Sequence, residues 1–174
     1  MLKNAIRFIL FILIQVFVLF KIEPLHRFIV PYLYFLYILW LPFNMSRVNL
    51  LLLGFFYGLT LDAFTQNPGL YSSCCTLIAY VRGFLISVLI PQEGADQNYK
   101  SPSITSMGLA PYATYVIILT LLHNGYLVLL EWLRFGSFLE FLGKVLATSG
   151  ISLLLILVTE VLFSRKEKFR TNTA

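Results

Sequence analysis

The sequence predicts an all-α integral membrane protein with about six transmembrane helices. Of its 174 residues, 59% are hydrophobic and only 12% are charged, and the mean hydropathy is +0.82. Such a composition offers too little polar surface to coat a soluble globule. A hydrocarbon core about 30 Å thick needs about 20 apolar helical residues, so this length with short loops holds roughly six spans. We therefore expect one polytopic membrane domain over residues 1–164.

Six apolar stretches supply the predicted spans. Pro31 lies near the start of the second stretch and Pro42 near its end, while Asn67, Pro68 and Gly69 form a tight turn between the third and fourth. The second and third stretches are short, so a five-span or partly re-entrant arrangement also fits the sequence. The spans are predicted over residues 6–20, 28–41, 48–62, 70–90, 112–130 and 145–163.

The placement of lysine and arginine predicts the orientation. If the N-terminus is cytoplasmic, eight of these residues fall on the inner side and four on the outer side. Cytoplasmic loops of membrane proteins carry the excess of positive charge, which favours both termini inside. The basic tail over residues 165–174 contributes most, and it lies where anionic lipid would attract it.

The third stretch contains the most informative pattern, in which Gly54, Gly58 and Asp62 follow one another at intervals of four residues. On a helix these positions share one face. Two glycines on that face let a neighbouring helix approach closely, because no side chain separates the backbones. Asp62 needs a dipole, a cation or water nearby, because an unpaired charge in hydrocarbon is costly. The face is predicted to pack against an internal helix or a partner helix.

Other polar residues inside the predicted spans are candidates for pairing. Asp62 lies near the outer end of its span, at a depth compatible with His123 and Asn124, so we expect either a contact between Asp62 and His123 or exposure of Asp62 to interfacial water. Arg82 and Glu160 lie in the inner halves of their spans and either pair or extend separately towards the headgroups. We favour the headgroup position for Glu160, and a structural pairing or a partner-facing role for Arg82.

A search for catalytic chemistry gives little. Cys74 and Cys75 are adjacent, without the spacing of a metal site or a redox pair, and are expected to be small packing groups. His26 has no Cys, His or carboxylate at ligand spacing. The sequence contains no nucleophile elbow, HExxH motif, phosphate-binding loop or paired acidic motif. We therefore expect no enzymatic activity, cofactor, metal or nucleic-acid partner.

The chain resembles the rod shape-determining protein MreD family. The resemblance extends over the length, the six-span hydropathy, the cytoplasmic ends and the basic tail, and it is carried by a G-x-x-x-G-x-x-x-D helix followed by a polar turn. Family members often read Pro-Leu-Gly at the turn, whereas Pro68 and Gly69 are adjacent here. The positions that match the family pattern are Gly54, Gly58, Asp62, Pro68 and Gly69.

The resemblance implies a non-enzymatic scaffold of the bacterial inner membrane that acts in cell shape, within the machinery for lateral wall elongation. Such a scaffold would bind the single-span protein MreC. It would lie in a larger complex with MreB, RodA and its cognate transpeptidase, and would position these peptidoglycan synthases. No matching residue is implied to be catalytic.

The family is also similar to the substrate-binding subunits of energy-coupling vitamin transporters, which implies their six-helix fold and an alternative function. In that alternative, Asp62, His123 and Asn124 would line a ligand cavity in the outer half of the membrane. A solute site needs several convergent polar groups, whereas Leu, Ile and Phe dominate these spans. The sequence therefore favours the scaffold over the transporter.

Overall fold

The computed structural model describes residues 2–21, 30–90, 101–132 and 137–163. Within these ranges the chain is mostly helical and has no strands. Five helical stretches are long and apolar enough to cross a membrane, as expected for a multi-pass membrane protein. They are α1 (Leu2–Leu13) with its continuation to Lys21, α3 (Arg47–Thr65), α4 (Leu70–Leu89), α6 (Leu109–Trp132) and α7 (Phe138–Leu162).

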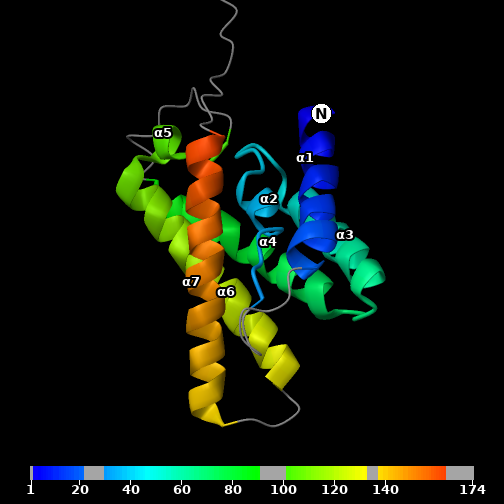
Figure 1. Ribbon diagram of the computed structural model, residues 1–174. Helices are drawn as coiled ribbons and strands as arrows, with labels where there is room; N and C mark the ends of the chain where they lie inside the picture. Colours follow the sequence, from blue (N-terminus) through cyan, green and yellow to red (C-terminus); the bar gives the residue numbers. More distant parts are fainter. Residues whose placement is uncertain (1, 22–29, 91–100, 133–136, 164–174) are drawn as a thin grey trace, which may run out of the picture.

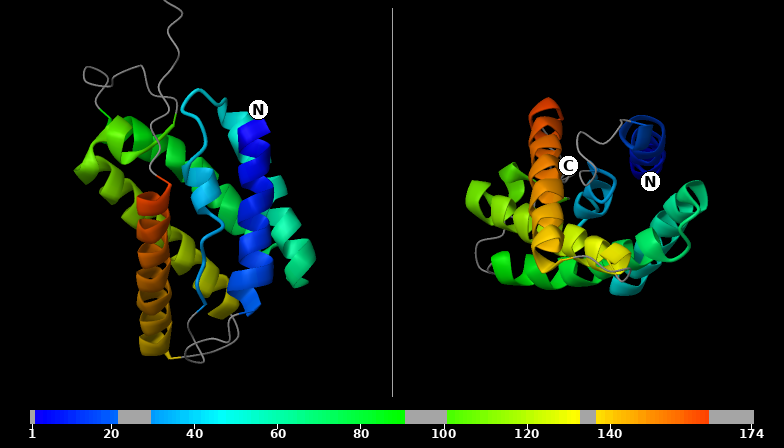
Figure 2. Two further views of the ribbon diagram at one scale, coloured as in Figure 1. Left: turned by 45° about the horizontal axis from the view of Figure 1, so that its top comes forward. Right: turned by 60° about the horizontal axis from the view of Figure 1, so that its bottom comes forward.

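Two short helices complete the described fold, α2 (Leu36–Leu39) and α5 (Ile104–Met107). Successive passages of the chain run in opposite directions, so that α1 begins and α7 ends at the same end of the molecule (Figures 1 and 2). We call this the upper end, as it is drawn in Figure 1, and the opposite end the lower end. The basic tail predicted over residues 165–174 lies outside the described residues.

The second predicted span differs most from expectation. A helix over residues 28–41 was predicted, but the described part of this stretch has no helical structure before α2, which is a single turn. The chain nevertheless runs from the lower to the upper end here, between the long helices (Figures 1 and 2). Pro31 disfavours helical geometry in the residue before it, and the backbone groups that follow it bond to side chains of neighbouring helices instead of to one another. We call residues 30–42 the core segment.

The core segment is the most deeply buried part of the described fold. Every residue from 32 to 41 is buried, and several are completely inaccessible. Non-helical backbone at membrane depth is stable only where protein surrounds it and supplies hydrogen-bond partners. Of the arrangements that the sequence left open, the described residues form five helices long enough to span a membrane, around a passage that is non-helical except for α2, instead of six helical spans.

The α3–α4 hairpin follows the prediction closely. Ser46 begins α3 by accepting a hydrogen bond from the backbone N–H of Asn49 at 3.3 Å. The intervening turn has left-handed backbone at Gln66 (φ 56°) and at Gly69 (φ 89°). Gly69 suits this conformation because it has no Cβ. The adjacent Pro68 and Gly69 thus form the tight turn expected from the sequence.

The last two long helices extend further than predicted. Helix α6 begins at Leu109 instead of residue 112, after Gly108 with its positive φ of 84°. Helix α7 begins at Phe138 instead of residue 145, because the hydroxyl of Ser137 accepts a hydrogen bond from the N–H of Glu140 and caps the first turn.

Candidate functional site

Gln15 holds the lower half of the core segment. Its amide nitrogen donates to the carbonyl of Pro31 at 3.1 Å, and its amide oxygen accepts from the N–H groups of Leu33 (2.9 Å) and Tyr34 (3.2 Å). Gln15 is completely buried and lies in the π-helical turn Ile14–Val18 that continues α1. One side chain therefore replaces three of the backbone partners that a helix would have supplied.

Hydroxyl groups from other helices hold the same region. The hydroxyl oxygen of Ser152 on α7 accepts from the N–H of Tyr32 at 3.2 Å. The hydroxyl of Tyr57 on α3 donates to the carbonyl of Tyr34 at 2.9 Å. Three separate helices thus satisfy the non-helical backbone, so its conformation depends on the assembled bundle.

Arg82 on α4 holds the upper end of the core segment. Its guanidinium donates to the carbonyl of Leu41, to the carbonyl of Pro42 at 3.4 Å, and to the hydroxyl of Tyr115 at 3.1 Å. Tyr115 on α6 in turn donates to the carbonyl of Leu39 at 3.1 Å. Although only 2% of Arg82 is exposed, the partners found for it in the described residues are neutral oxygens. Its role is therefore internal to the fold.

Glu160 lies close to this cluster at the upper end. Its carboxylate accepts from the indole N–H of Trp40 at 2.7 Å and from the hydroxyl of Tyr112. The guanidinium of Arg7 lies over the Trp40 ring, 5.9 Å from its centroid. Glu160 was expected to extend towards the headgroups, but in the structure it connects α7 to the core segment and to α6.

His123 and Asn124 form a third cluster, near mid-depth. The Nε2 atom of His123 lies 2.6 Å from the hydroxyl of Tyr34, and its ring stacks on Phe35 with 4.4 Å between centroids. The other ring nitrogen lies 3.0 Å from the side-chain oxygen of Asn124, whose amide donates to Ser149 at 3.2 Å. Because that oxygen only accepts, Nδ1 carries the proton, and in the neutral ring Nε2 accepts from Tyr34.

Asp62 has a different role. Its carboxylate accepts from the N–H of Tyr71 at 2.7 Å and from those of Gly69 and Ser72 at 3.1 Å each. These groups begin α4, where no earlier carbonyl is available and where the helix dipole favours negative charge. Gly69 at the N-cap position has no side chain for this purpose, so Asp62 supplies the cap from α3. The expected contact with His123 is not formed, and only 3% of Asp62 is exposed.

The glycine face of α3 packs against α4. A Cβ atom built on Gly58 would lie 2.3 Å from the Cα of Ser72, and one on Gly54 would lie 3.0 Å from the Cβ of Ala79. The first distance leaves no room for any side chain. The face that the sequence assigned to either an internal or a partner helix is therefore used internally.

These placements divide the sequence-predicted site residues into two groups. Gly54, Gly58, Asp62 and Gly69 build the α3–α4 hairpin, together with Pro68 in its turn. The other four contact the core segment directly or through one neighbour; they are Arg82, His123, Asn124 and Glu160.

Sequence reasoning did not identify the other residues that hold the core segment. Gln15 was visible as the one strongly polar side chain between Arg7 and Lys21, and Pro31 and Pro42 mark a stretch unsuited to a continuous helix. The tyrosines of α3 and α6 gave no signal, because aromatic residues are common in membrane helices. These residues are Gln15, Tyr57, Tyr112, Tyr115, Ser149 and Ser152.

The side chains at this site, some neutral and some charged, form hydrogen bonds with the core segment. These bonds fix the conformation of its backbone. Within the described ranges, no three His, Cys, Asp or Glu side chains gather in an arrangement suited to a metal ion. Cys74 and Cys75 are buried and have free thiols. Comparison of the chain with protein-family models, with curated proteins and with solved structures found no match.

Proposed function

We propose that this protein is a non-enzymatic scaffold of the bacterial inner membrane that acts in lateral wall elongation. In this role it binds a single-span MreC-like protein and positions peptidoglycan synthases, in a complex with MreB, RodA and its transpeptidase. Its resemblance in sequence to the MreD family is the starting point. The proposal is also supported by the hydrogen bonds that its intramembrane polar groups make within the protein.

The observation that carries the proposal is that the buried carboxylate, imidazole and amide groups predicted as candidate solute ligands bond to the protein itself. His123 and Asn124 are inaccessible and hydrogen-bonded to Tyr34 and Ser149, and Asp62 caps α4. These are the three residues that would line a solute cavity in a vitamin-type transporter. Because each is bonded to the protein itself, the arrangement favours a positional role over solute binding.

A groove between α6 and α7 agrees with this interpretation. It has a volume of about 470 Å³ and is lined mainly by apolar side chains, including Val116, Ile117 and Leu157. Its two polar residues, Tyr112 and Glu160, already bond to each other. A solute site would offer polar groups directed at the ligand, whereas this groove suits lipid or another helix.

The outward faces of the long helices provide the surface for partners. Large apolar side chains are exposed on α1, α3 and α7, for example Ile9, Phe56 and Leu157. In a bilayer such faces contact either acyl chains or the helices of other proteins. A rigid bundle with several such faces suits a protein that holds single-span and multi-span partners in fixed register.

Co-purification tests the proposal. The tagged full chain is expressed with a candidate MreC-like single-span protein, extracted in mild detergent and recovered by its tag, and the bound material is identified by mass spectrometry. We expect the single-span protein to be retained and an unrelated single-span membrane protein to be lost. If the folded protein retains neither single-span protein, the scaffold proposal is contradicted. A vitamin recovered with the protein in a one-to-one ratio would support the transporter function instead.

The same proposal includes both termini in the cytoplasm. Fusion of a fluorescent protein to the C-terminus is expected to give fluorescence, whereas fusion of alkaline phosphatase should be inactive. Active phosphatase would reverse the orientation inferred from the positive charges.

A further inference from the structure

A groove at the lower end of the molecule separates the end of α1 from the α3–α4 turn. Its volume is about 450 Å³, within the range of about 300–1,000 Å³ typical of small-ligand sites. Phe17, Phe20 and Phe64 form an aromatic wall, and Lys21 and Asn67 lie at its polar side. The groove thus has an apolar side and a polar side next to each other. It lies at the end of a long helix, which in a membrane is the level at which lipid headgroups adjoin the hydrocarbon core.

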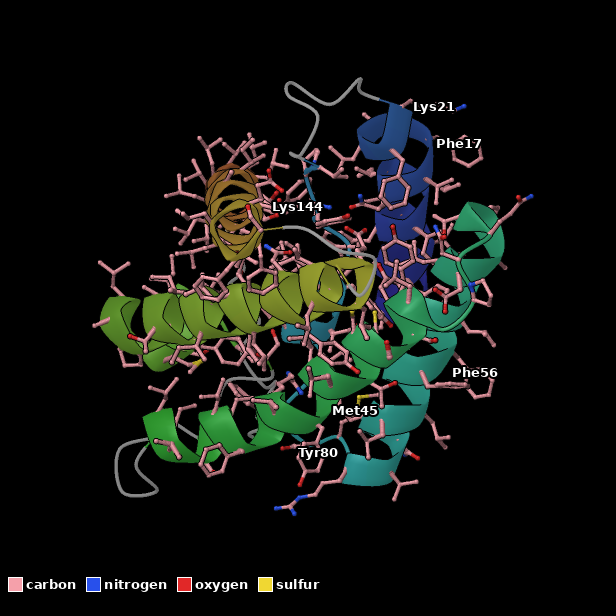
Figure 3. The ribbon with its side chains drawn as sticks, turned by 90° about the horizontal axis from the view of Figure 1, so that it is seen from below. Phe17, Lys21, Met45, Phe56, Tyr80 and Lys144 are labelled. Atoms are coloured by element: carbon pink, nitrogen blue, oxygen red, sulfur yellow. The ribbon has the colours of Figure 1, made fainter. Side chains whose placement is uncertain are left out.

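Two lysines at this end of the molecule differ in their electrostatic environment. The ammonium of Lys144 on α7 lies 2.6 Å from a carboxylate oxygen of Glu131 and forms an ion pair. Lys21 makes no ion pair or side-chain hydrogen bond with any other residue that the structure describes. Figure 3 shows Lys144 pointing from α7 towards the middle of the bundle and Lys21 pointing away from it. Lys21 therefore provides a positive charge beside the groove that no carboxylate of the described residues neutralises.

The rest of the groove complements this charge. Asn67 is exposed and donates one amide hydrogen to the carbonyl of Thr65, which leaves a second donor for an anion. Phe17 and Phe64 are 59% and 54% exposed, so their rings have apolar surface available for contact. Phe17 projects from α1 on the same side as Lys21 (Figure 3).

We propose that this groove binds an anionic membrane phospholipid. Its phosphate lies at Lys21 and Asn67, and one acyl chain lies against Phe17 and Phe64. The aromatic wall gives an acyl chain close dispersion contacts that a free phosphate ion cannot make, so the groove favours a lipid over a free ion. In the proposed orientation the lower end faces the outer leaflet, and there the positive charge of Lys21 attracts an anionic headgroup, which gives the charge preference. The inference rests on the residues of this groove and does not depend on the proposed scaffold function.

Lipid binding to the purified full chain tests this inference. Native mass spectrometry compares phosphatidylglycerol with phosphatidylcholine of the same acyl chains, for the natural protein and for Lys21→Gln. We expect the natural protein to prefer phosphatidylglycerol and Lys21→Gln to bind it about fivefold more weakly, the effect of one lysine near an anionic headgroup.

Lys144→Gln is the matched control, because it removes one positive charge at the same end from a lysine that is already paired. It should change phosphatidylglycerol binding by less than about twofold. If both variants bind phosphatidylglycerol equally weakly, the lipid is attracted to the charged surface in general and the proposed site is wrong. Unchanged binding by Lys21→Gln would also overturn the proposed site.

The apolar wall needs its own measurement. Phe64→Ala should weaken binding of both phospholipids, because it removes acyl-chain contact and leaves Lys21 in place. Soluble glycerol phosphate should not displace bound phosphatidylglycerol, and effective displacement would contradict the acyl-chain contact. Circular dichroism confirms that each variant remains helical, which separates loss of lipid from loss of fold.

Discussion

The core segment and the α3–α4 hairpin both lie within the bundle, but different interactions stabilise them. In the hairpin, the helices satisfy their own backbone except at the start of α4, which Asp62 caps, and Gly58 brings α3 against the backbone of α4 at Ser72. In the core segment, side chains such as Gln15 and Arg82 bond to backbone groups that no helix satisfies. Close packing stabilises the hairpin, whereas polar complementarity stabilises the core segment.

This difference shows two solutions to the same problem. Lipid tails are as apolar as leucine, so burial of apolar surface gives little drive for helices to associate within the bilayer. Small residues let two regular helices gain dispersion contacts at short range. An irregular segment instead needs a specific partner for each backbone group, because each unsatisfied group in hydrocarbon costs several kcal/mol. Steric and polar substitutions should therefore affect the two regions differently.

The largest expected effect is that of Gly58→Leu. A Cβ at this position lies 2.3 Å from the Cα of Ser72, so α3 and α4 must separate and the hairpin is lost. We expect more than about 4 kcal/mol of destabilisation, measured by unfolding in detergent. Gly83→Leu on α4 is the control, because nothing lies within 4 Å of its Cβ position. Equal tolerance of both substitutions would contradict close packing of the hairpin.

Gln15→Leu should have the next largest effect, on the core segment. The substitution preserves side-chain size but removes the bonds to Pro31, Leu33 and Tyr34. Because these backbone groups stay buried, we expect a loss of about 3 kcal/mol, measured by the same unfolding assay. Phe17→Leu, on the exposed side of the same helix, should be nearly neutral. Natural stability in Gln15→Leu would show that the core segment does not depend on this amide.

Asp62→Ala tests the cap of α4. Removal of the carboxylate leaves the N–H groups of Gly69, Tyr71 and Ser72 without this acceptor, with an expected loss of about 2 kcal/mol. Asp62→Asn keeps one acceptor oxygen and should lose less. Hydrogen exchange at these amides should become faster in the alanine variant, and unchanged protection would contradict the capping role.

Ser152→Ala should have the smallest effect. It removes one hydrogen bond, to the N–H of Tyr32, with an expected loss of about 1 kcal/mol of unfolding free energy. Ser87→Ala is an exposed control whose hydroxyl bonds only within its own helix. Ser152 makes one hydrogen bond to the core segment, whereas Gln15 makes three. Equal losses of unfolding free energy in Ser152→Ala and Gln15→Leu would contradict this difference.

Much of the fold could be predicted from the sequence. The third and fourth spans were located within a few residues, because glycine, proline and hydrophobicity act locally at Gly54, Gly58, Pro68 and Gly69. The glycine spacing also predicted a closely packed helix face, although it left open whether the partner was internal.

The core segment could not be predicted in the same way. Its apolar residues resemble those of a membrane helix, and its conformation is set by Gln15, Arg82 and Ser152, which are distant in sequence. Depth along the spans suggested that Asp62 and His123 meet, but depth does not specify which helices are neighbours. Asp62 reaches the next helix through a short turn, and His123 faces Tyr34 of the core segment.

The most direct test is the backbone conformation of the core segment in the membrane. Solid-state NMR of the labelled full chain in lipid bilayers gives the carbon chemical shifts of Tyr32 and Leu33, which precede α2. We predict non-helical shifts at both residues, with helical shifts only in the turn Leu36–Leu39 and in the residues that flank it directly, Phe35 and Trp40. Continuous helical shifts from residue 30 to residue 41 would contradict a non-helical passage held by side chains of the surrounding helices.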